Sequence, residues 1–103
     1  MTDIEDIYLM VKTAAAHAFD ALQRGKIAWP TYRTYVDEYN HLLTLTKEKC
    51  GEEIDKYLKP IEVDSSRLSY DLIDYPGELL SIASLRLKQL EAYLDSKRPA
   101  VII

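Results

Sequence analysis

The stretch from residue 30 to residue 58 constrains the fold most strongly, because apolar or semi-apolar side chains recur through it at helical spacing. These side chains are Tyr32, Val36, Tyr39, Leu43, Thr46, Cys50, Ile54 and Tyr57. Steps of three and four residues place them on one side of an α-helix. Gly51 would cost about 1 kcal/mol inside a helix, yet the apolar phase continues beyond it. We therefore predict one continuous amphipathic helix over residues 30–58, about 43 Å long at 1.5 Å per residue.

A first helix is predicted near the start of the chain. Thr2 and Glu5 have the spacing of a capping box, and Gly25 stands where a helix could end in a left-handed conformation. These signals predict a helix over residues 3–24. Its apolar stripe consists of Ile4, Ile7, Tyr8, Val11, Ala14, Ala15, Ala18, Phe19 and Leu22.

Two further helices are predicted after Pro60, which ends the helix before it. Asp64 or Ser65 can cap a short helix over residues 65–74. The last helix spans residues 76–97 and opens on a proline, a residue that suits the first turn. Its apolar stripe consists of Leu79, Leu80, Ala83, Leu87, Leu90 and Leu94.

These elements predict an all-α fold within a single helical domain over residues 1–103. The architecture is an elongated antiparallel three-helix bundle, with the short additional helix between the second and third long helices. A compact chain of this length would be only about 34 Å across, so the long second helix makes the bundle elongated. The 48% apolar content is that of an ordinary globular protein.

Composition also excludes several classes of function. The net charge of −4 comes from 13 basic and 17 acidic residues that are mixed along the chain, so we expect no nucleic-acid binding. No apolar run approaches the roughly 20 residues of a membrane span, so we expect no membrane insertion. The single cysteine, Cys50, excludes an intrachain disulfide and fits a reducing, cytoplasmic location.

Glu38 and His41 are the candidate metal ligands. Glu-x-x-His places a carboxylate and an imidazole side by side on a helix, and the motif recurs in di-iron bundle proteins. A complete site of that kind needs two such pairs and two further glutamates, so only a symmetric dimer of this chain would assemble one. Rotation of about 100° per residue turns both side chains away from the apolar stripe. We therefore predict no metal site and no cofactor, and no catalytic residue is identifiable.

Glu48, Glu52 and Asp55 support an alternative function. Their spacing is similar to the Glu-x-x-Glu/Asp helical pairs that hold magnesium in all-α nucleotide pyrophosphohydrolases. The resemblance covers one short segment, and the last helix lacks the second acidic pair of that family. The alternative is thus a small all-α metal- or nucleotide-handling enzyme that uses acidic and histidine residues of the second helix.

Apolar residues that point away from the bundle suggest the main function. Leu85 lies well off the apolar stripe of its helix, and Ile82 lies near Leu85 in helical phase. The chain ends in an apolar tail over residues 99–103. Apolar surface of this extent is costly to leave in water, so we predict an interface. Its residues are Ile82, Leu85, Val101, Ile102 and Ile103. The sequence therefore predicts a small cytoplasmic protein–protein interaction module without catalytic activity of its own. We expect it to form a homo-oligomer, most simply a C2 homodimer, or to bind another protein.

Overall fold

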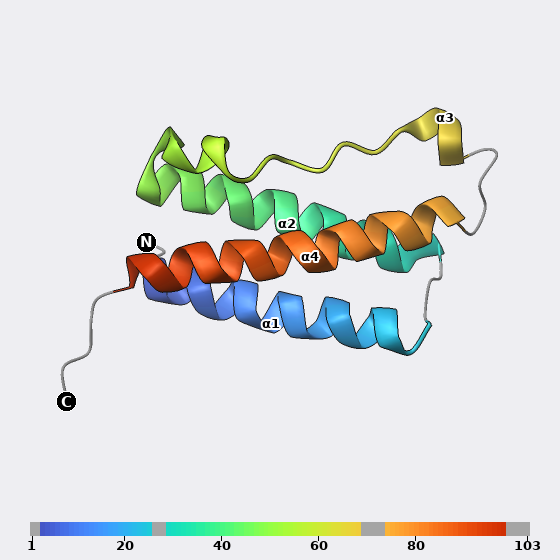
Figure 1. Ribbon diagram of the computed structural model, residues 1–103, viewed down its shortest axis with the longest axis horizontal. Helices are drawn as coiled ribbons and strands as arrows, with labels where there is room; N and C mark the ends of the chain where they lie inside the picture. Colours follow the sequence, from blue (N-terminus) through green and yellow to red (C-terminus); the bar gives the residue numbers. More distant parts are fainter. Residues whose placement is uncertain (1–2, 26–28, 69–73, 99–103) are drawn as a thin grey trace.

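Three long α-helices pack against one another and carry two short helical turns beside them (Figure 1). The computed structural model describes residues 3–25, 29–68 and 74–98. Its elements are α1 (Ile4–Gln23), α2 (Trp29–Cys50), the 3₁₀ helix η1 (Glu52–Lys56), α3 (Ser65–Leu68) and α4 (Asp74–Lys97). No strand occurs within these ranges. The predicted all-α bundle is confirmed, and its principal-axis extents of 51 × 27 × 22 Å confirm that it is elongated.

Helix α1 matches the predicted range of residues 3–24 to within one residue at each end. Its N-cap is Asp3, whose carboxylate accepts the N–H of Asp6 at 2.9 Å, whereas the predicted capping residue, Thr2, lies outside the described residues. An aspartate here also places negative charge at the positive end of the helix dipole. At the other end Gly25 takes a φ of 67°, which confirms the predicted left-handed termination.

Helix α2 ends at Cys50, so the prediction of a continuous helix over residues 30–58 is wrong. Gly51 takes a φ of 87° and a ψ of −178°, and its N–H donates to the carbonyl of Lys47 at 2.9 Å. That hydrogen bond closes the last turn, and the chain then folds back as η1, which buries Ile54. The apolar phase beyond Gly51 therefore belongs to a turn that packs beside the end of α2.

The folded-back turn is also held by charge. Lys47 Nζ lies 2.8 Å from Asp55 Oδ1, and this hydrogen bond raises the pKa of Lys47. Tyr57, which a straight helix would have buried, is consequently displaced from the core and is 67% exposed. Cys50, the last residue of α2, is half-buried.

An extended segment, residues 58–64, carries the chain back along α2 and is called the strap below (Figure 1). Helix α1 runs antiparallel to α4, because Glu5 pairs with Arg98 at one end and Phe19 lies against Lys88 farther along. It also runs antiparallel to α2, so α2 and α4 run in the same direction (Figure 1). The strap is what makes this parallel pair possible.

The predicted short helix over residues 65–74 is described only in part. Residues 65–68 form α3, and residue 74 belongs to α4. Residues 69–73 lie outside the described residues. The carboxylate of Asp64 accepts hydrogen bonds from the N–H and the hydroxyl of Ser66 at 3.0 and 2.7 Å, which caps α3 and lowers the pKa of Asp64. Helix α4 begins slightly before Pro76, which lies in its first turn.

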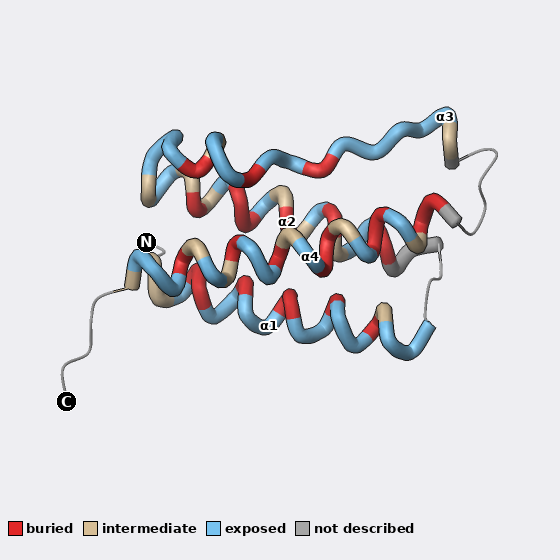
Figure 2. The backbone as a smooth tube through the Cα atoms, in the orientation of Figure 1, coloured by how far each residue is buried: buried red, intermediate tan, exposed pale blue. Residues whose placement is uncertain are grey.

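The core is one cluster to which α1, α2, η1, the strap and α4 all contribute (Figure 2). Its largest fully buried side chains are Tyr39, Ile7, Leu42, Ile54, Leu79, Leu80, Leu87, Leu90, Leu94, Val11, Val36 and Thr46. The predicted stripe of the last helix is buried in full. The predicted stripe of the first helix is wrong at Phe19, which is 41% exposed, and Leu22 is only partly buried.

Candidate functional site

Helices α1 and α4 present apolar side chains to solvent on a shared side of the bundle. Leu85 is 58% exposed and Phe19 is 41% exposed. Lys88 Nζ lies 4.3 Å from the centroid of the Phe19 ring, and Leu85 precedes Lys88 by three residues on α4. Since residues three apart share a helix face, the two apolar side chains lie on the same side. The other predicted interface residue of α4, Ile82, is partly buried against the core.

A groove of about 530 Å³ runs between α1 and α4 beside the Phe19 ring. It is lined by Lys12, Ala15, Ala16, Phe19, Lys88 and Glu91. The two alanines carry single methyl groups, so α1 leaves room that a larger side chain from another molecule would fill. These six residues together with Leu85 are called the α1–α4 face below.

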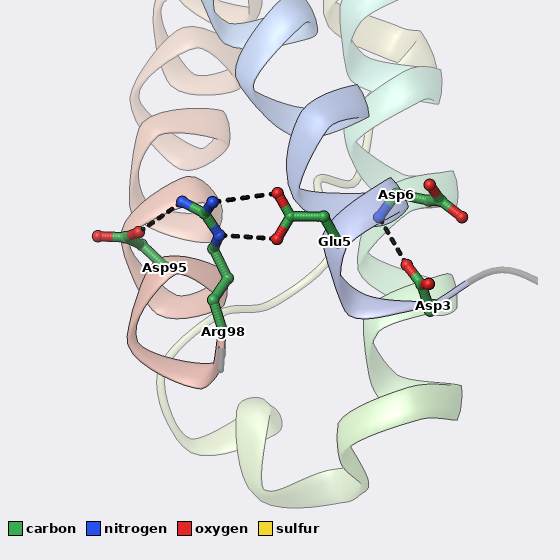
Figure 3. Close-up of polar contacts among 5 residues, drawn as sticks. All are labelled: Asp3, Glu5, Asp6, Asp95 and Arg98. Atoms are coloured by element: carbon green, nitrogen blue, oxygen red, sulfur yellow. Dashed lines mark hydrogen bonds and ion pairs between the residues drawn. The ribbon is translucent and has the colours of Figure 1, made fainter. Parts of the chain in front are cut away.

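Arg98 ties the end of α4 to the start of α1 (Figure 3). Its Nε and Nη2 donate to the two carboxylate oxygens of Glu5 at 2.9 and 3.0 Å, and its Nη1 donates to Asp95 at 3.2 Å. The guanidinium also lies 4.2 Å from the centroid of the Tyr8 ring. The hydrogen bonds from Arg98 to Glu5 hold the pKa of Arg98 above its ordinary value. These contacts of Arg98 are called the clamp below. Outside the described residues lie the predicted interface residues Val101, Ile102 and Ile103.

The candidate metal ligands Glu38 and His41 are not brought into a metal centre. His41 is exposed, and Glu38 is half-buried at the edge of a separate groove of about 290 Å³ that Leu9, Met10 and Thr13 also line. Across residues 3–25, 29–68 and 74–98, no group of three or more His, Cys, Asp or Glu side chains is placed to hold a metal ion.

The acidic residues of the alternative function are divided between two elements. Glu48 lies on α2, whereas Glu52 and Asp55 lie on η1, beyond the break at Gly51. Asp55 is already paired with Lys47. The resemblance to the magnesium-binding helical pairs depended on three carboxylates sharing one helix, and that arrangement is not formed.

Cys50 lies beside Tyr93 at the end of the bundle where α2 stops. Burial raises the pKa of the Cys50 thiol, and Lys97 lowers it only in part. A raised pKa favours the protonated thiol over the more nucleophilic thiolate. Burial likewise raises the pKa of Tyr93, whose buried hydroxyl lacks a hydrogen-bond partner among the described residues.

Sequence reasoning missed two features of the surface. Phe19 stands at a position whose helical phase lies at the border of the apolar stripe, and only its pairing with Lys88 shows which way it turns. Asn40 binds the main chain of Ile61, which is remote in sequence, and no local pattern indicates this contact.

Within the described residues, none of the helices combines the length and the apolar character needed to cross a membrane. Comparisons with protein-family models, with curated proteins and with solved structures gave no match to this chain.

Proposed function

We propose that this protein is a helical protein–protein interaction module that pairs with a second copy of itself through the α1–α4 face. The observation that carries the proposal is the exposure of Leu85 (58%) and Phe19 (41%) on one side of the bundle, beside an alanine-lined groove. In a C2 dimer the same surface meets itself, so each contact occurs twice. In such a contact, an exposed apolar side chain of one copy can enter the groove of the other copy, and the reverse.

The charges around the groove suit association between identical copies. Lys12 and Lys88 line it together with Glu91, so both signs are present on one face. When the face meets a copy of itself in the C2 arrangement, lysines of one copy can lie opposite the glutamate of the other. A face of single sign would repel its copy.

The expected affinity is modest. Full burial of a leucine or phenylalanine side chain stabilises by about 1.5–3 kcal/mol, so covering two that are roughly half exposed contributes about 1 kcal/mol each. Doubled by symmetry this is about 4 kcal/mol before the entropy cost of association is subtracted, so these side chains alone would not give a dissociation constant below about 1 mM. With a contribution from the groove and from the predicted interface residues of the tail, we expect a value between about 10 μM and 1 mM.

We also propose a cytoplasmic location. The support is the single cysteine of the chain, because secreted domains of this size commonly rely on several disulfides.

Sedimentation velocity from about 1 μM to about 1 mM tests the dimer. We expect the wild-type chain to shift from monomer to dimer over this range, and Leu85→Glu to remain monomeric throughout. Leu9→Glu is the matched control, because Leu9 is also an exposed leucine (51%) on a long helix but borders the separate groove with Met10. A wild-type chain that stays monomeric at the highest concentration overturns the proposal, as does equal behaviour of the two variants.

A further inference from the structure

Hydrogen bonds to main-chain atoms of the strap hold it against α2 and α4. The six hydrogen bonds described between the strap and the long helices α2 and α4 all involve strap main-chain atoms. They come from four side chains: Tyr39 and Asn40 of α2, and Tyr75 and Arg86 of α4. Contacts of this kind recognise an extended backbone and leave the identity of its exposed side chains open.

Asn40 makes the most specific of these contacts. Its Nδ2 donates to the carbonyl of Ile61 at 3.0 Å, and its Oδ1 accepts the N–H of the same residue at 2.8 Å. A primary amide thus binds both polar groups of one residue, as a neighbouring β-strand would. The paired geometry requires Ile61 to be extended.

Hydroxyl and guanidinium groups hold the strap on either side of Ile61. The Tyr39 hydroxyl donates to the carbonyl of Lys59 at 2.8 Å, and Arg86 Nη1 donates to the same carbonyl. Toward the other end, the N–H of Asp64 donates to the Tyr75 hydroxyl at 2.7 Å. Hydrogen bonds from α2 and α4 therefore occur along most of the strap.

Two side chains anchor the strap in the core. Leu58 and Ile61 are buried, at 4% and 7% exposure, while the residues between and after them are exposed. Pro60 fixes its own φ and keeps Lys59 out of the α region, so this segment is extended before it binds. The recognised pattern is an apolar residue, two spacers that end in proline, and a second apolar residue.

We infer that the seam between α2 and α4 is a binding site for an extended peptide of this pattern, occupied here by the chain's own strap. A groove of about 340 Å³ lies open beside it, lined by Tyr32, Arg33, Val36, Asp37, Asn40, Ile61, Val63 and Ser65. A partner segment with two apolar residues three positions apart takes the place of the strap when the strap lifts. The site is separate from the α1–α4 face and does not depend on dimer formation.

A labelled synthetic peptide with the sequence of residues 57–64 tests the inference by fluorescence anisotropy. The receptor is the full chain carrying Leu58→Ser and Ile61→Ser, which removes the strap's anchors and leaves the four binding side chains in place. We expect the peptide to bind this variant at least about 10-fold more tightly than the wild-type chain, whose site is occupied. A peptide with serine at the two apolar positions should not bind either protein.

Asn40 provides the internal control. Adding Asn40→Leu to the double variant should abolish peptide binding. Thr44→Ala, one turn along α2, should leave it unchanged, because the hydrogen bond described for the Thr44 hydroxyl goes to the carbonyl of Asn40 within its own helix. A folded double variant that fails to bind the peptide overturns the inference. Equal binding to the wild-type chain and to the double variant also overturns it.

Amide hydrogen exchange on the wild-type chain tests the inference even if the double variant does not fold. A strap that lifts locally exposes the hydrogen-bonded amides of Ile61 and Asp64 without unfolding the bundle. We expect these amides to exchange at least about 10-fold faster than those of Leu87 and Leu90 in α4. Exchange at the rate of the α4 amides would show that the strap opens only when the whole molecule unfolds, and would overturn the inference.

Discussion

Two glycines take backbone conformations that other residues rarely adopt, and they end the first two long helices. Gly25 has a φ of 67°, in the left-handed helical range. Gly51 combines a φ of 87° with a ψ of −178°, a region that is essentially restricted to glycine. A Cβ built at either position has no heavy atom within 4 Å, so any cost of substitution comes from the backbone alone.

Alanine substitution should therefore distinguish the two glycines. Gly51→Ala is expected to lower the free energy of unfolding by about 1–3 kcal/mol, and Gly25→Ala by about 1 kcal/mol. Urea denaturation followed by circular dichroism measures both. An unchanged free energy of unfolding in Gly51→Ala would show that α2 does not depend on this turn. A larger decrease in Gly25→Ala than in Gly51→Ala would contradict the expected order of the two glycines.

At the scale of elements, α1 and α4 form the most extensive helix pair, and Arg98 fastens one end of it. The guanidinium binds both oxygens of Glu5 and lies against the Tyr8 ring, so it combines a two-pronged hydrogen bond with a cation–π contact. Lysine has one ammonium group and cannot make the paired contact. The clamp holds the last turn of α4 against α1.

Arg98→Lys should therefore loosen the end of α4. We expect faster amide exchange in residues 94–97, with the centre of α4 unchanged. Arg33→Lys is the control, because Arg33 pairs with Asp37 on the exposed surface of α2, where the two side chains are 76% and 69% exposed. Such exposed pairs contribute little, so this variant should behave as wild type. Unchanged exchange at residues 94–97 in Arg98→Lys would contradict the role given to the clamp.

The elements differ in how well sequence patterns predicted them. Both α1 and α4 agree with their predicted ranges because local signals mark their ends: a capping sequence and Gly25 for α1, and Pro76 and Pro99 for α4. The predicted range of the second long helix was too long, because the spacing of apolar residues is the same for a straight helix and for one whose next turn folds back and buries Ile54. The charge pair between Lys47 and Asp55, which helps hold that turn, joins two elements and has no signal in helical phase.

At the scale of the whole molecule, one continuous core joins all three long helices. That residues 1–103 form a single domain stays a prediction. Leu90 is fully buried within the core, whereas the neighbouring Gln89 is exposed. The two positions allow the core and the surface of α4 to be compared.

Leu90→Ala should cost about 2–5 kcal/mol because it leaves a cavity in the shared core. Gln89→Ala should change the free energy of unfolding by less than about 0.5 kcal/mol. Helical circular dichroism and the near-ultraviolet signal of the tyrosines should show one coincident transition in each variant. Separate transitions would mean that part of the bundle unfolds alone and would contradict a single domain.

The candidate site was predicted only in part. Helical phase was sufficient to identify Leu85 as an outward-facing leucine, because its position on α4 depends on that helix alone. The alanine-lined groove depends on how α1 and α4 lie against each other, as does the exposure of Phe19. The contacts between Asn40 and the strap depend on a chain reversal that single-helix patterns do not encode.

The order of the helices along the chain also affects how the protein folds during synthesis. Helices α1 and α2 leave the ribosome first, while α4, the main partner of α1, follows after residues 51–73. At 5–20 residues per second, residues 51–97 take roughly 2–9 s to emerge. Throughout that interval the first two helices expose the apolar stripes that α4 later covers, so the core cannot be completed before α4 has been synthesised.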